Sequence, residues 1–139
     1  EEERRRAGKN KEEPSKGNKD VEKAEELKLP QQEFGDKLAI YYCNRGAALL
    51  YMNRYDEAIQ DSDVAVLLNP KYVKAYVRRS MAYEKSGKTE DALLDAKKAL
   101  ELDPANATIR KSVARLQKIE DERLEKMKEE TIGKAVEHF

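Results

Sequence analysis

Apolar residues return every three or four positions through four segments of the chain, over residues 37–52, 55–68, 73–85 and 90–102. This spacing places the apolar residues of each segment on one side of an α-helix. The longest uninterrupted apolar runs, AALLYM and VAVLL, are far too short to span a membrane. The pattern therefore predicts four amphipathic helices and an all-α protein.

Capping and turn residues mark the ends of these helices. Asp36 and Thr89 are the candidate N-caps of the first and fourth helices, because a short polar side chain can accept a hydrogen bond from a free helix N–H. Pro70 and Pro104 follow the second and fourth helices, and Gly87 lies in the turn between the third and the fourth. We therefore expect two helical hairpins with short turns.

The two hairpins are copies of one unit, because equivalent residues recur 34 positions apart. The equivalent pairs are Tyr42 and Tyr76, Arg45 and Arg79, Ala58 and Ala92, Asp61 and Asp95, Ala65 and Ala99, Leu68 and Leu102, and Pro70 and Pro104. Small residues, Gly46 and Ser80 among them, occupy positions where paired helices must approach closely. This period is that of tetratricopeptide repeats. The sequence thus predicts a solenoid with repeats at 39–72 and 73–106.

The segments that flank the two repeats follow the pattern less well. Residues 107–137 are expected to form a long charged helix that caps the stack, with a short coiled coil as the alternative. Residues 1–36 are in register with a further repeat, but Pro14 and Pro30 interrupt its helices and few apolar residues remain. We therefore predict a degenerate or disordered leading segment over 1–36 and a repeat domain over 37–139.

The amino-acid composition disfavours several classes of function. The chain has 28 Lys and Arg against 28 Asp and Glu, which disfavours a globally basic nucleic-acid binder. Cys43 is the single cysteine and His138 the single histidine, so no nucleophile and base pair and no cysteine-rich metal site is indicated. We therefore predict a soluble, cytoplasmic protein without enzyme activity, cofactor or metal, and without a membrane or nucleic-acid partner.

Three polar residues at related repeat positions form the candidate binding site. Lys74 and Arg78 are four residues apart and so share one face of a helix, and Asn44 lies one repeat period before Arg78. Two cations and an amide donor suit a free carboxylate, which they would hold through charge-assisted hydrogen bonds. The alternative is an ordinary solvated surface, since Lys and Arg are common on exposed helix faces.

The sequence resembles the tetratricopeptide domains of chaperone adaptors over about residues 37–117. The resemblance lies in the Asn-Arg pair followed by small residues, the Ala-rich second helix with its proline, and the run K-x-x-x-R-R. The terminal segment ERLEKMKEETIGK is also similar to the helix that follows the repeats in one member of this family. The resemblance implies a carboxylate clamp for the C-terminal Glu-Glu-Val-Asp of the seventy- and ninety-kilodalton heat-shock proteins.

The resemblance also implies which residues form the clamp. Asn44 matches the clamp asparagine of one repeat, and Lys74 and Arg78 match the cations of the next. Arg6 and Asn10 are the candidates for the remaining two positions. An apolar side chain of the bound peptide is expected one turn further along the same faces, against Ala47, Tyr51 and Met81. A place in the core is the other interpretation of these three residues.

Two other functions stay open at this point. The first is a scaffold that binds another protein partner through its groove or its charged C-terminal helix, without a working clamp. The second is a nucleic-acid binder, for which Lys71, Lys74, Arg78 and Arg79 with Tyr72 and Tyr76 form the nearest basic and aromatic cluster. Interspersed acids disfavour the second function.

Overall fold

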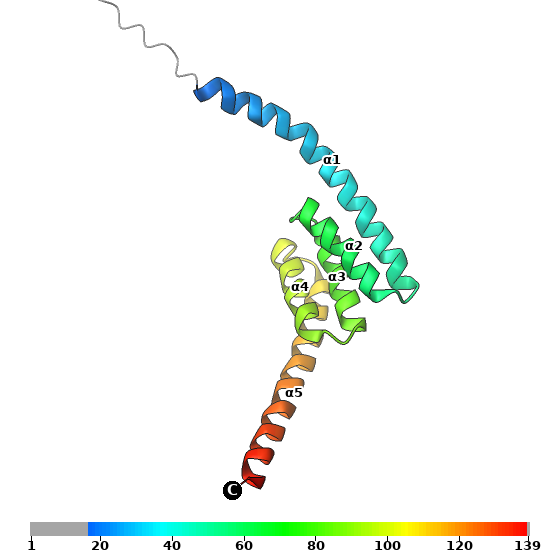
Figure 1. Cartoon of the computed structure of the whole chain (residues 1–139), viewed down its shortest axis with the longest axis vertical. Coiled ribbons are helices and arrows are strands. Elements are labelled where there is room, and N and C mark those ends of the chain that lie inside the picture. The colour runs from blue at the N-terminus through cyan, green and yellow to red at the C-terminus, as the bar shows by residue number, and fades with distance from the viewer. Residues whose placement is uncertain (1–16, 139) are drawn as a thin grey trace, which may run out of the picture. The chain divides into compact units, whose positions relative to one another are not determined.

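The structure is a computed structural model that describes the backbone of residues 17–138 and the side chains of residues 32–138. It contains the helices α1 (Gly17–Tyr51), α2 (Tyr55–Leu68), α3 (Val73–Lys85), α4 (Thr89–Leu102) and α5 (Ala107–Glu137), shown in Figure 1. The chain divides into two units, Glu1–Phe34 and Gly35–Phe139. No helix in the described part of the chain combines the length and apolarity needed to cross a bilayer.

The second unit consists of two helical hairpins and a terminal helix. The C-terminal part of α1 pairs with α2, α3 pairs with α4, and α5 packs against α4 (Figure 1). The helices follow the predicted order, and α2 and α4 begin and end one repeat period apart. The predicted all-α solenoid of hairpins with a long capping helix is therefore confirmed.

Small residues let the paired helices approach closely. The side chains of Ala58 and its repeat equivalent Ala92 are fully buried. A Cβ atom added to Gly46 would lie 3.3 Å from Ser62 Oγ of α2 and 3.4 Å from the Ala58 carbonyl oxygen. At the equivalent position in the second hairpin, Ser80 Oγ donates a hydrogen bond of 2.8 Å to the Ala92 carbonyl. Larger side chains at these positions would push the helices apart.

Each hairpin also contains an arginine–aspartate pair that joins its two helices. In the first, Arg45 Nε and Nη2 donate to the two Asp61 carboxylate oxygens at 2.6 and 2.8 Å. In the second, Arg79 donates in the same bidentate way to Asp95 at 2.8 and 2.7 Å. Both aspartates are buried, so the arginines supply the hydrogen bonds that buried carboxylates require.

Two predicted helix starts are wrong. The first helix does not begin after an Asp36 cap, because α1 already starts at Gly17 and continues through Pro30. An internal proline removes one backbone hydrogen bond, at a typical cost of about 3 kcal/mol, but it does not stop the bonds on either side of it. Thr89 is the first helical residue of α4 and not its N-cap. The N-cap is Lys88, whose side chain forms no capping hydrogen bond.

The capping helix α5 has a packed beginning and an exposed end. Asn106 caps its N-terminus by accepting a hydrogen bond of 3.2 Å from the Ile109 N–H. Ile109 and Leu116 are buried against the hairpins, whereas every residue from Asp121 to His138 is exposed. Figure 1 shows this last part running on beyond the hairpins as a single helix. Leu116 therefore closes the core, and the rest of α5 extends past it.

Candidate functional site

The three candidate clamp residues lie on two neighbouring helices of one unit. Asn44 is on α1, and Lys74 and Arg78 are one turn apart on α3. Asn44 and Lys74 are exposed, and Arg78 is half-buried. We call this set the α1–α3 site. Its polar side chains are accessible to a ligand from solvent.

Cys43 of α1 is buried in a cluster with residues of α2 and α3. Cys43 is 1% exposed and packs against Ala65 and Ala75. Its burial raises the pKa of the thiol, while the positive charges of Arg78 and Lys74 act in the opposite direction. Since Cys43 precedes Asn44 in α1, the packing of Cys43 against Ala75 places the helix that carries the asparagine beside the helix that carries the two cations. A buried thiol with a raised pKa is a packing residue and not a nucleophile.

Arg78 and Arg79 are adjacent in sequence and have opposite roles. Arg79 is 19% exposed and pairs with Asp95 and with Asp63. Among the described residues, no carboxylate forms an ion pair with Arg78 or with Lys74. Two neighbouring cations without a counter-ion among the described residues leave positive charge exposed on this face of α3.

The predicted apolar contacts are only partly brought together. Ala47 is half-buried on α1, Tyr51 ends α1 with 91% of its surface exposed, and Met81 on α3 is 42% exposed. Tyr51 and Met81 are therefore not core residues. Met81 lines a pocket, whereas Ala47 and Tyr51 do not contribute to it.

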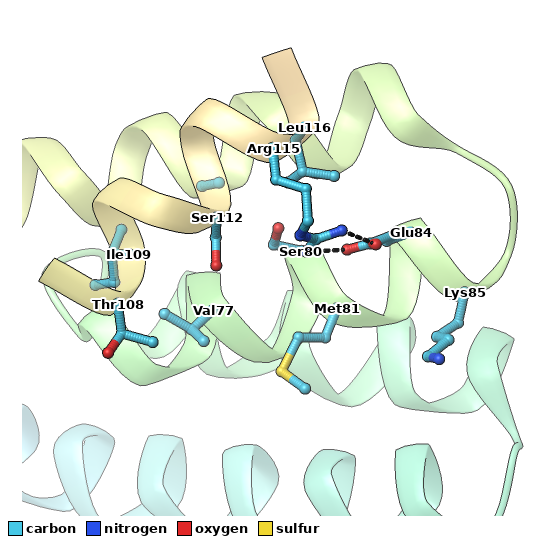
Figure 2. A pocket seen from close by; sticks show the side chains of 11 residues that line it. Val77, Ser80, Met81, Glu84, Lys85, Thr108, Ile109, Ser112, Arg115 and Leu116 are labelled. Carbon is cyan, nitrogen blue, oxygen red and sulfur yellow. Dashed lines mark hydrogen bonds and ion pairs between the residues drawn. The ribbon is translucent and has the colours of Figure 1, made fainter. Parts of the chain in front are cut away.

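This pocket of about 360 Å³ lies between α3 and α5 (Figure 2). Its lining is mostly apolar and includes Val77, Met81, Ile109 and Leu116. At its rim Arg115 forms a bidentate ion pair with Glu84, in which Nη2 donates to Oε2 at 2.9 Å. Arg115 lowers the pKa of the Glu84 carboxyl. The pocket is large enough for one apolar side chain and has one charged edge.

Sequence reasoning missed the α5 side of this pocket. Thr108, Ser112 and Arg115 stand one repeat period after Lys74, Arg78 and Met81, so they continue the same rows of the repeat onto α5. The signal was present, because extending the period by one more step identifies all three. The same step shows that neither cation of the α1–α3 site is repeated on α5, where threonine and serine replace them.

Two candidate clamp residues and a possible metal site have not yet been located. Arg6 and Asn10, the two clamp candidates, lie outside the described residues. In the part of the chain that the structure describes, no group of three or more His, Cys, Asp or Glu side chains could hold a metal ion.

Family comparison identifies the hairpins. A model of the tetratricopeptide repeat matches residues 39–72, and a second model of the same repeat matches residues 73–106. The two hairpins are tetratricopeptide repeats. The regular repeat spacing, the close helix contact at Gly46 and the repeated alanines are thus features of this repeat family.

Proteins with similar tetratricopeptide repeats include co-chaperones. The chain is 44% identical over 72 residues to a DnaJ homolog subfamily C member 7 homolog of Dictyostelium discoideum, covering 52% of this chain and 13% of that protein. It is 40% identical over 89 residues to Hsp70-Hsp90 organizing protein 1 of Glycine max, covering 62% of this chain and 16% of that protein. The chain therefore spans less than a fifth of either relative.

Solved structures similar to this chain include two with bound chaperone peptides. The first tetratricopeptide domain of Spaghetti (RPAP3), bound to the HSP90 peptide SRMEEVD, is 31% identical with a TM-score of 0.57, over 58% of this chain and 64% of that one. The second such domain of human RPAP3, in complex with the HSP70 peptide SGPTIEEVD, is 33% identical with a TM-score of 0.55. The match covers 57% of this chain and 66% of that chain.

Proposed function

We propose that the chain is a protein-binding adaptor whose α1–α3 site captures the acidic C-terminal peptide of a chaperone. The observation that carries this proposal is the unpaired state of Lys74 and Arg78. Among the described arginines, Arg78 and Arg110 form no ion pair, whereas others such as Arg79 and Arg115 are paired with carboxylates. Two such cations on one helix face, with an exposed amide on the neighbouring helix, suit a ligand with carboxylates.

Each of the three residues has a distinct role in this binding mode. Arg78 donates bidentate hydrogen bonds to one carboxylate, because its guanidinium is planar. Lys74 supplies a mobile point charge one turn away, suited to a second carboxylate. Asn44 donates its amide N–H across from α1. Since Asn44 and Lys74 are exposed, binding is expected to weaken with salt.

The pocket between α3 and α5 extends the proposed site along the peptide. Met81 lies seven residues after Lys74, which corresponds to about 10 Å along a helix. An extended peptide covers that length in about three residues. An apolar side chain about three positions before the gripped carboxylate would therefore reach the pocket.

The peptide-bound relatives support the choice of partner. Both bound peptides end in Glu-Glu-Val-Asp, and both carry an apolar residue directly before it. Two carboxylates and an apolar side chain are the groups that the α1–α3 site and the pocket accommodate. We therefore propose the C-terminal peptides of the seventy- and ninety-kilodalton heat-shock proteins as partners, in the cytoplasm, where Cys43 stays reduced. Arg6 and Asn10 remain candidates for further clamp contacts.

The terminal segment supports a narrower relationship. ERLEKMKEETIGK, in the exposed part of α5, is similar to the helix that follows the repeats in tetratricopeptide repeat protein one. We propose that the chain is a relative of that protein.

Calorimetric titration with a peptide ending in Ile-Glu-Glu-Val-Asp tests the function. We expect binding of about 7 to 8 kcal/mol that weakens from low to physiological salt. The Lys74→Ala, Arg78→Ala double variant should lose it. The Lys97→Ala, Lys118→Ala variant removes the same charge from exposed positions of α4 and α5 and should bind as wild type.

Two further peptides separate the parts of the site. Amidation of the terminal carboxylate should abolish binding, and replacement of the isoleucine by serine should weaken it without changing the salt dependence. Equal binding by the amidated peptide, or by the Lys74→Ala, Arg78→Ala variant with intact helical circular dichroism, would refute the clamp.

A further inference from the structure

A second face of α1 carries exposed apolar side chains around a central arginine and is distinct from the α1–α3 site. Its members are spaced alternately three and four residues apart, which places them in one row along the helix. They are Leu38, Tyr41, Arg45, Ala48 and Met52, and we call this row the open α1 face. Tyr41 is 54% exposed and Met52 58%. Two exposed large apolar side chains on either side of a half-exposed arginine are candidates for an interaction surface.

The second repeat shows what covers this row. The equivalent residues, on α3 and at its two caps, are Tyr72, Ala75, Arg79, Ala82 and Ser86. Ala75 and Ala82 are fully buried, and they cluster with Ala65 and with Ala58 and Ile59 of α2. In α3, therefore, the row packs against the second helix of the preceding hairpin. Repeat geometry predicts that the open α1 face fits a helix of the same kind.

The charges on the two rows make the prediction more specific. Arg79 donates to Asp95 of its own hairpin and, at 3.0 Å, to Asp63 of α2. Arg45 likewise donates to an aspartate of its own hairpin, Asp61. Among the described residues it has no second carboxylate partner equivalent to Asp63. Its guanidinium lies over the Tyr41 and Tyr42 rings, and its side chain is 50% exposed against 19% for Arg79. The missing group is a carboxylate on a docked helix.

In the repeat register, the sequence of the leading segment lacks the pattern of such a helix. In α2 the residues that meet α3 are an apolar residue, the aspartate and a second apolar residue: Ile59, Asp63 and Val66. The residues one repeat period earlier are Glu25, Leu29 and Gln32. This register would place a leucine instead of a carboxylate against Arg45, and polar side chains against Tyr41 and Met52. Both the charge and the apolar pattern are therefore wrong for the open α1 face.

A second copy of this chain is also a poor occupant. Its α2 is already covered by its own α3. Two open α1 faces placed together would bring Arg45 against Arg45, without a carboxylate between them.

We propose that the open α1 face docks an amphipathic helix of the α2 type. The helix carries an apolar residue, a carboxylate and a second apolar residue at positions i, i+4 and i+7. The carboxylate pairs with Arg45, as Asp63 pairs with Arg79, and the apolar residues cover Tyr41 and Met52. Such a partner extends the stack by one helix at its open end. This surface operates whether or not the α1–α3 site binds acidic peptides.

Methionine methyl resonances of the full chain provide the test. The three methionines, Met52, Met81 and Met127, report separately on the open α1 face, the pocket and the exposed part of α5. The probe is an acetylated and amidated peptide of residues 55–70, with a lactam bridge between positions 56 and 60, which are exposed in α2. Without a free terminal carboxylate, the probe lacks the main group expected at the α1–α3 site.

We expect saturable shifts of Met52, with Met81 and Met127 unchanged. An Asp63→Lys version of the peptide should bind about fivefold more weakly. Tyr41→Glu in the chain should abolish the shift, while Leu67→Glu, the same kind of change at an exposed position of α2, should not. An unmoved Met52, equal binding to the Tyr41→Glu variant, or shifts at Met81 instead would each overturn the proposal. A failed titration with the Glu-Glu-Val-Asp peptide would refute the proposed function of the α1–α3 site but would not overturn this proposal.

Discussion

The two repeats place equivalent residues in different surroundings. Arg79 lies between two hairpins, reaches Asp63 on one side and Asp95 on the other, and is 19% exposed. Arg45 has the same partner within its own hairpin, Asp61, but its side chain is 50% exposed. The hairpins share this internal arginine–aspartate pair. The environment of the arginine is therefore determined by the neighbouring repeat and not by its own.

This difference reflects the neighbours that each repeat has among the described residues. In a repeat protein each unit contacts only its neighbours, so stability is a sum of units and interfaces. The second repeat has α2 on one side and α5 on the other. Substitutions at equivalent positions should therefore cost more in the second repeat than in the first whenever the residue takes part in an interface.

The largest expected effect comes from the arginines. Arg79→Leu leaves Asp95 buried without its partner and should reduce the free energy of unfolding by about 3 kcal/mol. Arg45→Leu should cost clearly less, because Arg45 lacks the second carboxylate and is half exposed. Urea denaturation of both variants measures the difference. Equal losses would show that the preceding hairpin contributes nothing to the Arg79 pair.

The pH dependence of the same variant sharpens the comparison. Burial already raises the pKa of Asp95, while Arg79 lowers it. Without Arg79 the folded-state pKa of Asp95 rises further above its unfolded value of about 3.9. A raised carboxyl pKa means that the folded state binds more protons, so the variant gains stability as the pH falls. Its deficit against wild type should shrink between about pH 7 and pH 4.

A smaller effect is expected at the helix contact inside the first hairpin. Gly46→Val adds a side chain where even a Cβ lies 3.3 Å from Ser62 Oγ, and should cost about 2 kcal/mol. Gly133→Val makes the same change in α5, where no atom lies within 4 Å of the added Cβ. This control should leave the urea midpoint nearly unchanged. A Gly46→Val variant as stable as the control would mean that the hairpin can open at this contact.

The sequence predicted the features that depend on one repeat or on its period. The helical hairpins, the close contact at Gly46 and the placement of Lys74 and Arg78 on one helix face all follow from local spacing. The continuation of α1 through Pro30 did not follow, because a proline lowers helix propensity without excluding a helix.

Features that depend on packing against the neighbouring repeat or against α5 were not predicted. The different roles of Arg78 and Arg79 depend on Asp63 and Asp95, which lie on other helices. The pocket between α3 and α5 likewise requires the packing of α5, even though Arg115 stands in the repeat register of Met81. Sequence periodicity shows which residues are equivalent, but it does not show which neighbours each copy meets.

The smallest expected effect concerns the turns, where the two repeats also differ. Asn53 and Gly87 occupy equivalent repeat positions, and both have a positive φ, of 61° and 81°. Glycine adopts this left-handed conformation without strain, and asparagine tolerates it better than other residues do. An added Cβ at Gly87 would meet no atom within 4 Å, so any cost of substitution there comes from the backbone.

Gly87→Val should therefore cost about 1 to 2 kcal/mol, and Gly87→Asn, which copies the first repeat, less than half of that. Urea midpoints of the two variants rank them, and equal losses would show that the turn does not keep its left-handed conformation in solution.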